Sequence, residues 1–193
     1  ALGATLKDLG YGSGLLPVKD YVAAKAPVFS FSKIGLAEIA LGPEMKSTGE
    51  VMGIGKTYSE ALYKAVNGAK MRIPAGGTIL LTVADRDKEE AMHLAEGFRS
   101  LGYHIIATEG TGKYFTDHGM DVDIVKKIHE DGQNIATMIR NGKIDLVVNT
   151  LTFGKRPERD GFNLRRMAVE LAVPCLTSLD TAREVLRVFA NKG

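Results

Sequence analysis

The sequence predicts an α/β fold: an open, mainly parallel sheet of about five strands flanked by helices, preceded by a smaller, irregular α+β segment. Two observations predict this. From Thr78 onward, short apolar runs alternate with longer stretches of helical period, which is typical of parallel strands covered on both faces. Residues 1–56 differ, because glycine or proline interrupts them every few positions.

The composition fits an ordinary globular protein. The 193 residues suit one or two small domains, with 45% hydrophobic and 25% charged residues. Lys and Arg exceed Asp and Glu by only 25 − 23 = 2, which excludes a strongly basic nucleic-acid platform. The apolar runs fall short of the roughly 20 residues that span a membrane, so no membrane partner is expected.

The single cysteine, Cys175, cannot form an internal disulfide or supply a cysteine metal cluster. Its apolar surroundings predict a buried structural thiol, and the cysteine usage indicates the cytosol. The chain begins at Ala1 without Met, as an excised fragment or a processed product would.

The smaller segment contains one predicted strand and one predicted helix. Val28–Phe31 alternates apolar and polar residues, as a strand does. Thr57 and Glu60 have the spacing of a capping box, which predicts a helix to about Asn67. A linker at 70–77 follows.

The predicted boundary separates residues 1–70 from residues 71–193. In the second part, the predicted strands are 78–83, 103–107, 124–125, 144–148 and 174–176. The predicted helices are a long one capped by Asp85 or Asp87 and ending at Leu101, then 113–117, 133–141, 161–172 and 178–190.

Small polar or cationic residues follow four of the predicted strands. Ligands of an open parallel sheet bind outside the carboxyl ends of its strands, and a helix start favours an anion. The pattern therefore predicts a phosphate cradle. The plainer alternative is that these are only caps and loop residues. The residues are Thr82, Asp85 and Lys88, the 108–113 glycine turn, Lys127, and Asn149, Thr150 and Thr152.

Two other sequence features do not predict a functional site. Gly112 and Lys113 suggest a P-loop, but Ala107 and Tyr114 occupy positions where that motif needs glycine and a hydroxyl. The four histidines lack metal-ligand spacing, so we expect no metal site.

One basic cluster is a solvated helix start, a phosphate contact or a subunit interface. It comprises Lys155, Arg156, Arg159, Arg165 and Arg166.

The segment Leu41–Gly53 (LGPEMKSTGEVMG) lacks an amphipathic period. Its residue choices are therefore expected to depend on backbone geometry and polar contacts rather than on packing. It resembles a signature of the carbamoyl phosphate synthetase large subunit. The resemblance extends over the whole chain and implies the tail of the second ATP-grasp half in 1–70 and a methylglyoxal synthase-like regulatory domain in 71–193. Supporting segments are Leu80–Val83 with Asp87 and Lys88, Ala107–Thr111, Val125–Glu130, Asn141 with Gly142, Val148–Thr150, and Arg165 with Arg166.

The resemblance implies a cytoplasmic, glutamine-hydrolysing ligase of pyrimidine and arginine biosynthesis. Such an enzyme makes carbamoyl phosphate from bicarbonate with ATP and Mg or Mn, and a small amidotransferase subunit supplies ammonia. Its catalytic residues lie upstream, so this chain alone is expected to hold no catalytic residue, cofactor or metal. An acidic residue that helps bind ornithine in some members falls near Ala26, so ornithine control is not expected.

The family's regulatory domain binds UMP as inhibitor and IMP as activator. The resemblance directs Lys88, Lys127 and the 108–111 turn toward the phosphate, and Asn149 with Thr150 toward base or ribose. The positions that match its nucleotide pocket are Thr82, Lys88, Thr108, Gly110, Thr111, Lys127, Asn149 and Thr150.

Two alternatives remain. A free-standing methylglyoxal synthase would use Asp85 and Lys88, but its carboxylate base falls on Gly132, one position from Asp131. A purely structural or interaction module is the other alternative. A homo-oligomer is also possible through exposed apolar residues, namely Val28, Phe29, Phe31 and Ile34.

Overall fold

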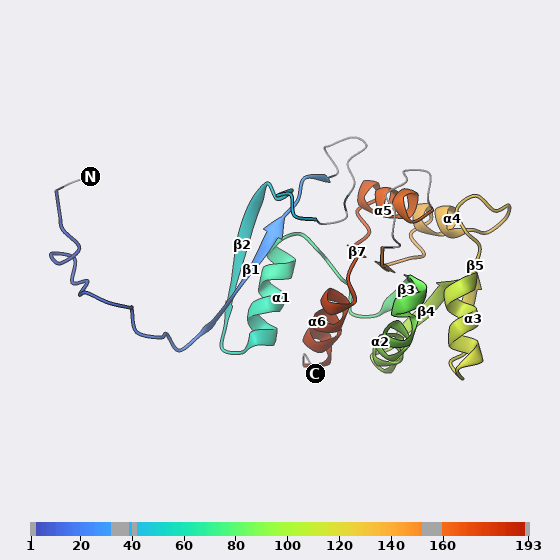
Figure 1. Ribbon diagram of the computed structural model, residues 1–193, viewed down its shortest axis with the longest axis horizontal. Coiled ribbons are helices and arrows are strands. Elements are labelled where there is room, and N and C mark those ends of the chain that lie inside the picture. Colours follow the sequence, from blue (N-terminus) through green and yellow to red (C-terminus); the bar gives the residue numbers. More distant parts are fainter. Residues whose placement is uncertain (1–2, 32–38, 40–41, 152–159, 192–193) are drawn as a thin grey trace.

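The computed structural model describes residues 3–31, 39, 42–151 and 160–191. It contains two sheets (Figure 1). A small antiparallel sheet packs with one helix, and a five-stranded parallel sheet has helices on both faces. This is the predicted α/β architecture with a smaller α+β segment in front of it.

The parallel sheet has the strand order β5-β4-β3-β6-β7, and every neighbouring pair is parallel. The predicted five-stranded parallel sheet is therefore confirmed. Its strands are β3 (Gly77–Thr82), β4 (Tyr103–Thr108), β5 (Asp123–Val125), β6 (Leu146–Asn149) and β7 (Cys175–Leu176).

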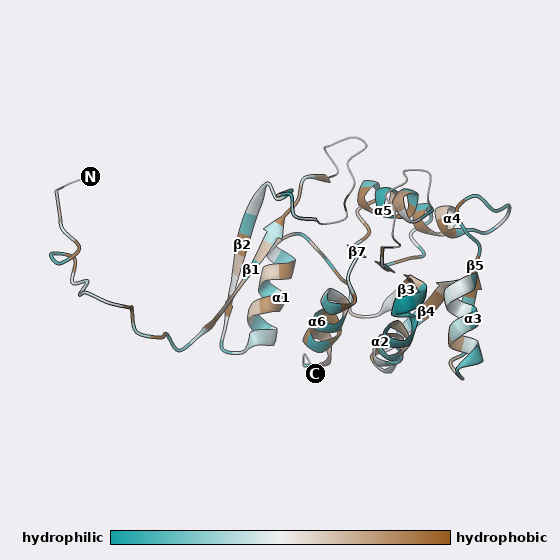
Figure 2. Ribbon diagram, in the orientation of Figure 1, coloured by the Kyte–Doolittle hydropathy of each residue, from teal (hydrophilic) through white to brown (hydrophobic). Residues whose placement is uncertain are grey.

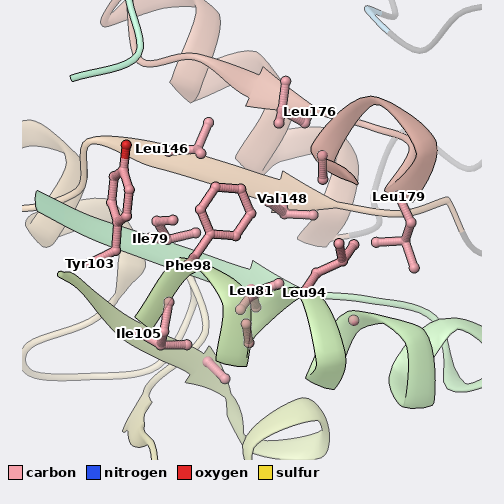
Figure 3. Packing of buried hydrophobic residues seen from close by; sticks show 14 of the residues in the cluster. Ile79, Leu81, Leu94, Phe98, Tyr103, Ile105, Leu146, Val148, Leu176 and Leu179 are labelled. Atoms are coloured by element: carbon pink, nitrogen blue, oxygen red, sulfur yellow. The ribbon is translucent and has the colours of Figure 1, made fainter. Parts of the chain in front are cut away.

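Two cores lie on opposite faces of this sheet. Side chains alternate along a strand, so Ile79 and Leu81 enter one core and Leu80 the other. Figure 3 shows the first core, where Phe98 packs against strand residues. Three helices cover that core: α2 (Lys88–Ser100), α3 (Glu109–Asp117) and α6 (Leu179–Ala190). The second core is covered by α4 (Ile135–Arg140) and α5 (Asp160–Glu170).

Hydropathy follows this layering. Figure 2 shows hydrophobic and hydrophilic residues side by side on α6. Such a helix buries one face, and Ala182, Val185 and Val188 are the buried residues there. None of the described helices has both the length and the apolar character needed to cross a membrane.

The smaller unit pairs β1 (Val22–Val28) with β2 (Gly49–Gly55), and α1 (Tyr58–Gly68) packs on one face. Glycines permit a close approach there. A Cβ at Gly53 would lie 2.0 Å from the Ala61 carbonyl oxygen and 2.5 Å from the Ala65 nitrogen. The backbone of α1 therefore lies directly against β2.

Two predictions in this unit are wrong. The strand predicted at 28–31 ends at Val28, because β1 uses the alternation of the Val22–Val28 run instead. The 41–53 segment, predicted to be irregular, enters β2 at Gly49. Glycine rather than a large apolar residue occupies the buried face of β2, so the period-2 signal is hidden.

The predicted capping box is present in modified form. Thr57 Oγ1 accepts a hydrogen bond from the Glu60 nitrogen at 3.2 Å. Glu60 Oε2 accepts from the Lys56 nitrogen at 2.8 Å, one residue before the expected partner. These two bonds give the main-chain nitrogens of Lys56 and Glu60 acceptors at the start of α1.

Three details of the larger unit also differ from prediction. Asp85 and Asp87 form a 3₁₀ turn, and neither side chain caps α2. The predicted glycine turn at 108–113 belongs largely to α3, which begins at Glu109. Gly112 lies within this helix, and glycine fits there because a Cβ would lie only 2.9 Å from Ile124 Cγ1. Cys175 is partly rather than fully buried.

Candidate functional site

Polar groups of β3 and β6 meet at the carboxyl ends of these neighbouring strands. Asn149 Nδ2 donates to the Thr82 carbonyl oxygen at 3.0 Å. The Ala84 nitrogen donates to Thr150 Oγ1 at 2.8 Å. Asn149 and Thr150 are both buried. The structure therefore brings three of the predicted site residues together.

A hydroxyl from α3 joins the same edge. Thr111 Oγ1 accepts a hydrogen bond from the Val83 nitrogen at 3.3 Å, and Thr111 is 2% exposed. A hydroxyl has one proton to donate. Because Thr111 and Thr150 accept from main-chain nitrogens, each can direct its own proton to another acceptor.

Arg165 lies behind Asn149. This residue of α5 is 6% exposed, and its Nη1 donates to Asn149 Oδ1 at 2.7 Å. Gly161 leaves room for this contact, since a Cβ there would lie 3.2 Å from Arg165 Nη1. The interpretation of Arg165 as part of a solvated helix start is wrong. A buried guanidinium requires polar partners, and Asn149 is one of them.

Lys88 begins α2 beside the same strand ends. Its Nζ lies 2.7 Å from Asp85 Oδ1 and 5.8 Å from the centre of the Tyr114 ring. A Cβ on Gly110 would lie 3.9 Å from that Nζ, so the lysine faces the first turn of α3. The hydrogen bond and charge of Lys88 lower the pKa of Asp85 below its ordinary value.

Two predicted residues occupy different surroundings. Thr108 precedes α3 and is buried, but its hydroxyl does not cap the helix. Lys127 follows β5, and its Nζ lies 3.8 Å from Asp160 Oδ2, the first residue of α5. His129 Nε2 lies 3.4 Å from the other oxygen of Asp160.

Several sequence candidates fall outside the described residues, namely Thr152, Lys155, Arg156 and Arg159. Among the residues that are described, no three His, Cys, Asp or Glu side chains form a group suited to a metal ion.

Sequence reasoning missed the role of Arg165. It precedes the buried Ala168 by three positions, so the two residues share one side of α5. That helical spacing was the available signal. The arginine pair was grouped instead with upstream basic residues.

These observations define a class: an α/β domain with one parallel sheet and a group of hydrogen-bond donors at its strand ends. Residues 90–177 match the family model described as MGS-like domain. The match covers less than half of the chain. It begins after β3, which the structure places at the centre of the same sheet.

Two solved structures are similar to this chain. One is methylglyoxal synthase from Elizabethkingia anophelis NUHP1, with 23% identity, coverage of 59% of this chain and 79% of that chain, and a TM-score of 0.46. The other is ForH, with 22% identity, coverage of 60% and 79%, and a TM-score of 0.44.

Proposed function

We propose that this chain is the regulatory C-terminal segment of a carbamoyl phosphate synthetase large subunit, and that its strand-end site binds a nucleoside monophosphate effector, UMP or IMP. The observation that supports effector binding best is the orientation of the Thr111 and Thr150 hydroxyls. Both accept from main-chain nitrogens, so both are left to act as donors. A site built from donors suits an anion.

Charge at the site agrees with a phosphate. Lys88 lies next to Gly110, and the nine-residue helix α3 begins there. Amide groups at a helix start and a nearby ammonium both favour negative charge. The Asp85 carboxylate holds Lys88 in place, and phosphate would compete with it for the ammonium group.

Asn149 is the proposed contact to base or ribose. Its Oδ1 accepts from Arg165, and one Nδ2 hydrogen goes to the Thr82 oxygen. An amide nitrogen carries two hydrogens, so one remains for a ligand acceptor. Lys127 would reach the phosphate only by giving up its contact with Asp160.

The parent enzyme is proposed from the resemblance of Leu41–Gly53 and its supporting segments. ATP, Mg or Mn and the amidotransferase subunit then belong to the parent, and its compartment is the cytoplasm. Control requires that the effector bind two states of that parent with different affinities.

A phosphate-eliminating lyase is the second candidate, favoured by the MGS-like match and by the position of Asp85 beside Lys88. A lyase of this kind needs a carboxylate base. The position of that base falls on Gly132, one residue from Asp131, so the chain lacks a carboxylate there. The regulatory function is therefore preferred.

Titration calorimetry with UMP, IMP and uridine tests the proposal. The two nucleotides should bind and uridine should bind far more weakly, because it lacks the phosphate. Lys88→Ala should lower nucleotide affinity about tenfold or more, since a charged hydrogen bond contributes roughly 1.5–3 kcal/mol.

Lys143→Ala is the matched control. It removes the same charge just before β6, at the opposite edge of the sheet, and should leave affinity unchanged. Absence of heat at millimolar UMP and IMP would contradict effector binding. Turnover of a triose phosphate by the chain would establish the lyase instead.

A further inference from the structure

A cavity separate from the proposed effector residues lies between α1 of the smaller unit and α6 of the larger one. Its volume is about 290 Å³. None of the proposed effector residues lines it. Its walls are mainly apolar, and include Leu62 and Val66 from α1 and Val185, Val188 and Phe189 from α6.

One carboxylate stands in this apolar wall. Glu184 Oε2 is buried and has no hydrogen-bond partner among the described residues, while the side chain as a whole is 35% exposed. The other oxygen, Oε1, lies 3.9 Å from Arg187 Nη1, which is beyond hydrogen-bond distance. A buried carboxylate oxygen without a donor is costly, so this position favours a donor from outside the chain.

None of the described neighbouring groups hydrogen-bonds Oε2 itself. Tyr58 lies near Glu184, and its pKa is raised by burial and then by the charge and hydrogen bond of Glu184. Asp180 also lines the cavity, but its carboxylate is paired with Arg183 at 2.8 Å. Oε2 of Glu184 is therefore the cavity oxygen that still lacks a donor among the described residues, while Tyr58 and Arg187 act on the rest of the carboxylate.

We propose that this cavity binds a small organic monocation, such as an alkyl or arylalkyl ammonium, with its ammonium group on Glu184 and its apolar body against α1 and α6. The terminal torsion of a glutamate side chain is broad, so either oxygen can turn toward the ligand. An ammonium donates to both carboxylate oxygens and compensates the charge.

The same features disfavour other ligand classes. A fatty acid or an amino acid would bring its own carboxylate near Asp180 and Glu184. An alcohol would fill the apolar space without compensating the charge. Because α1 and α6 belong to different units, a bound monocation would also tie the two units together.

Binding of hexylammonium is compared with that of 1-hexanol and hexanoate by methyl NMR titration of the full 193-residue chain. Hexylammonium should bind at least tenfold more tightly than hexanol, and hexanoate should bind most weakly. The shifted methyl signals should be those of Leu62, Val66, Val185 and Val188.

Glu184→Gln should remove the preference for ammonium over alcohol while hexanol still binds. Glu96→Gln is the matched control, because it makes the same change on the exposed face of α2. Leu62→Trp, which fills the cavity, should weaken all three ligands. The wild-type comparison needs no variant, so a misfolded variant does not decide the result.

Equal binding of hexylammonium and hexanol by the wild type would overturn the proposal. So would an ammonium preference that survives Glu184→Gln, or shifts confined to residues outside the cavity. UMP binding is read from other residues, so this test can fail while the effector proposal stands, and the reverse also holds.

Discussion

The two units of this chain achieve close packing by opposite means. The larger unit buries large side chains between layers, with Phe98, Leu81 and Leu146 all nearly inaccessible to solvent. The smaller unit removes side chains, so that the backbone of α1 touches β2 at Gly53 and Gly55. The larger unit is packed by large apolar side chains, whereas the smaller unit is packed by backbone contact at glycines.

The outer faces differ as well. Helices cover both faces of the parallel sheet, whereas α1 covers only one face of the β1–β2 sheet. On the other face Met52 is 66% exposed and Ile54 is 44% exposed. Met52 and Ile54 are two positions apart and so lie on the same face of β2, the face that α1 leaves uncovered.

Phe98→Ala should produce the largest effect and test the volume-based core. Phe98 is 1% exposed and packs edge-to-face on Tyr103 at 5.5 Å. Its truncation should cost about 3–5 kcal/mol of unfolding free energy. Urea denaturation measures this cost. Leu15→Ala, at a fully exposed position, should cost almost nothing.

Gly53→Ala should damage the smaller unit selectively. A methyl group there meets backbone atoms at 2.0 and 2.5 Å, and overpacking costs about 1–3 kcal/mol or more. Amide hydrogen exchange should show lost protection in β2 and α1 while β3 keeps its own. Gly49→Ala is the control, because its nearest contact is an ordinary 4.0 Å. Equal effects of the two variants would contradict the close-approach argument.

Arg165→Met should have an intermediate effect within the larger unit. The variant leaves Asn149 Oδ1 buried without Arg165 as its donor, which costs about 1–3 kcal/mol. Thermal unfolding measures the loss, and nucleotide titration should show weaker binding because Asn149 is released. Arg140→Met, at an exposed position of α4, should change neither quantity.

Tyr103→Phe should have the smallest effect and tests the connection between units. Tyr103 Oη donates to the Pro74 carbonyl oxygen at 2.6 Å, and the bond contributes about 1 kcal/mol. Burial raises the pKa of Tyr103 in the folded state.

A raised tyrosine pKa has a definite sign. The stability that the neutral Tyr103 side chain contributes is fully present below the unfolded-state pKa, about 10. This stability is lost as pH rises through the folded-state pKa. Wild-type stability should therefore fall more steeply than that of Tyr103→Phe on alkaline titration. Parallel curves would contradict this assignment.

The sequence was sufficient for the larger unit because its strands are marked by their own side chains. Runs such as Ile79–Leu81 and Leu146–Val148 are apolar on both faces, which is the pattern of a buried parallel strand. Such strands also fix where their carboxyl ends lie, so the gathering of Thr82, Asn149 and Thr150 could be predicted.

The sequence was insufficient where a residue's role depends on a distant backbone. Glycine is needed at position 53 of β2 because the backbone of α1 lies against it. Glycine is needed at position 112 of α3 because the Ile124 side chain lies against it. Locally, both glycines predict turns. Lys127 likewise depends on Asp160, a partner 33 positions away that no local pattern identifies.

The contact of α1 with β2 has a mechanical consequence. Flexible side chains between two elements absorb small displacements by changing rotamer, whereas backbone in direct contact with backbone cannot. At Gly53 and Gly55 the glycines place no side chain between the two elements, so α1 and β2 must move as a single stiff body. Any tilt of α1, including one imposed from its boundary with α6, becomes a displacement of the β1–β2 ribbon.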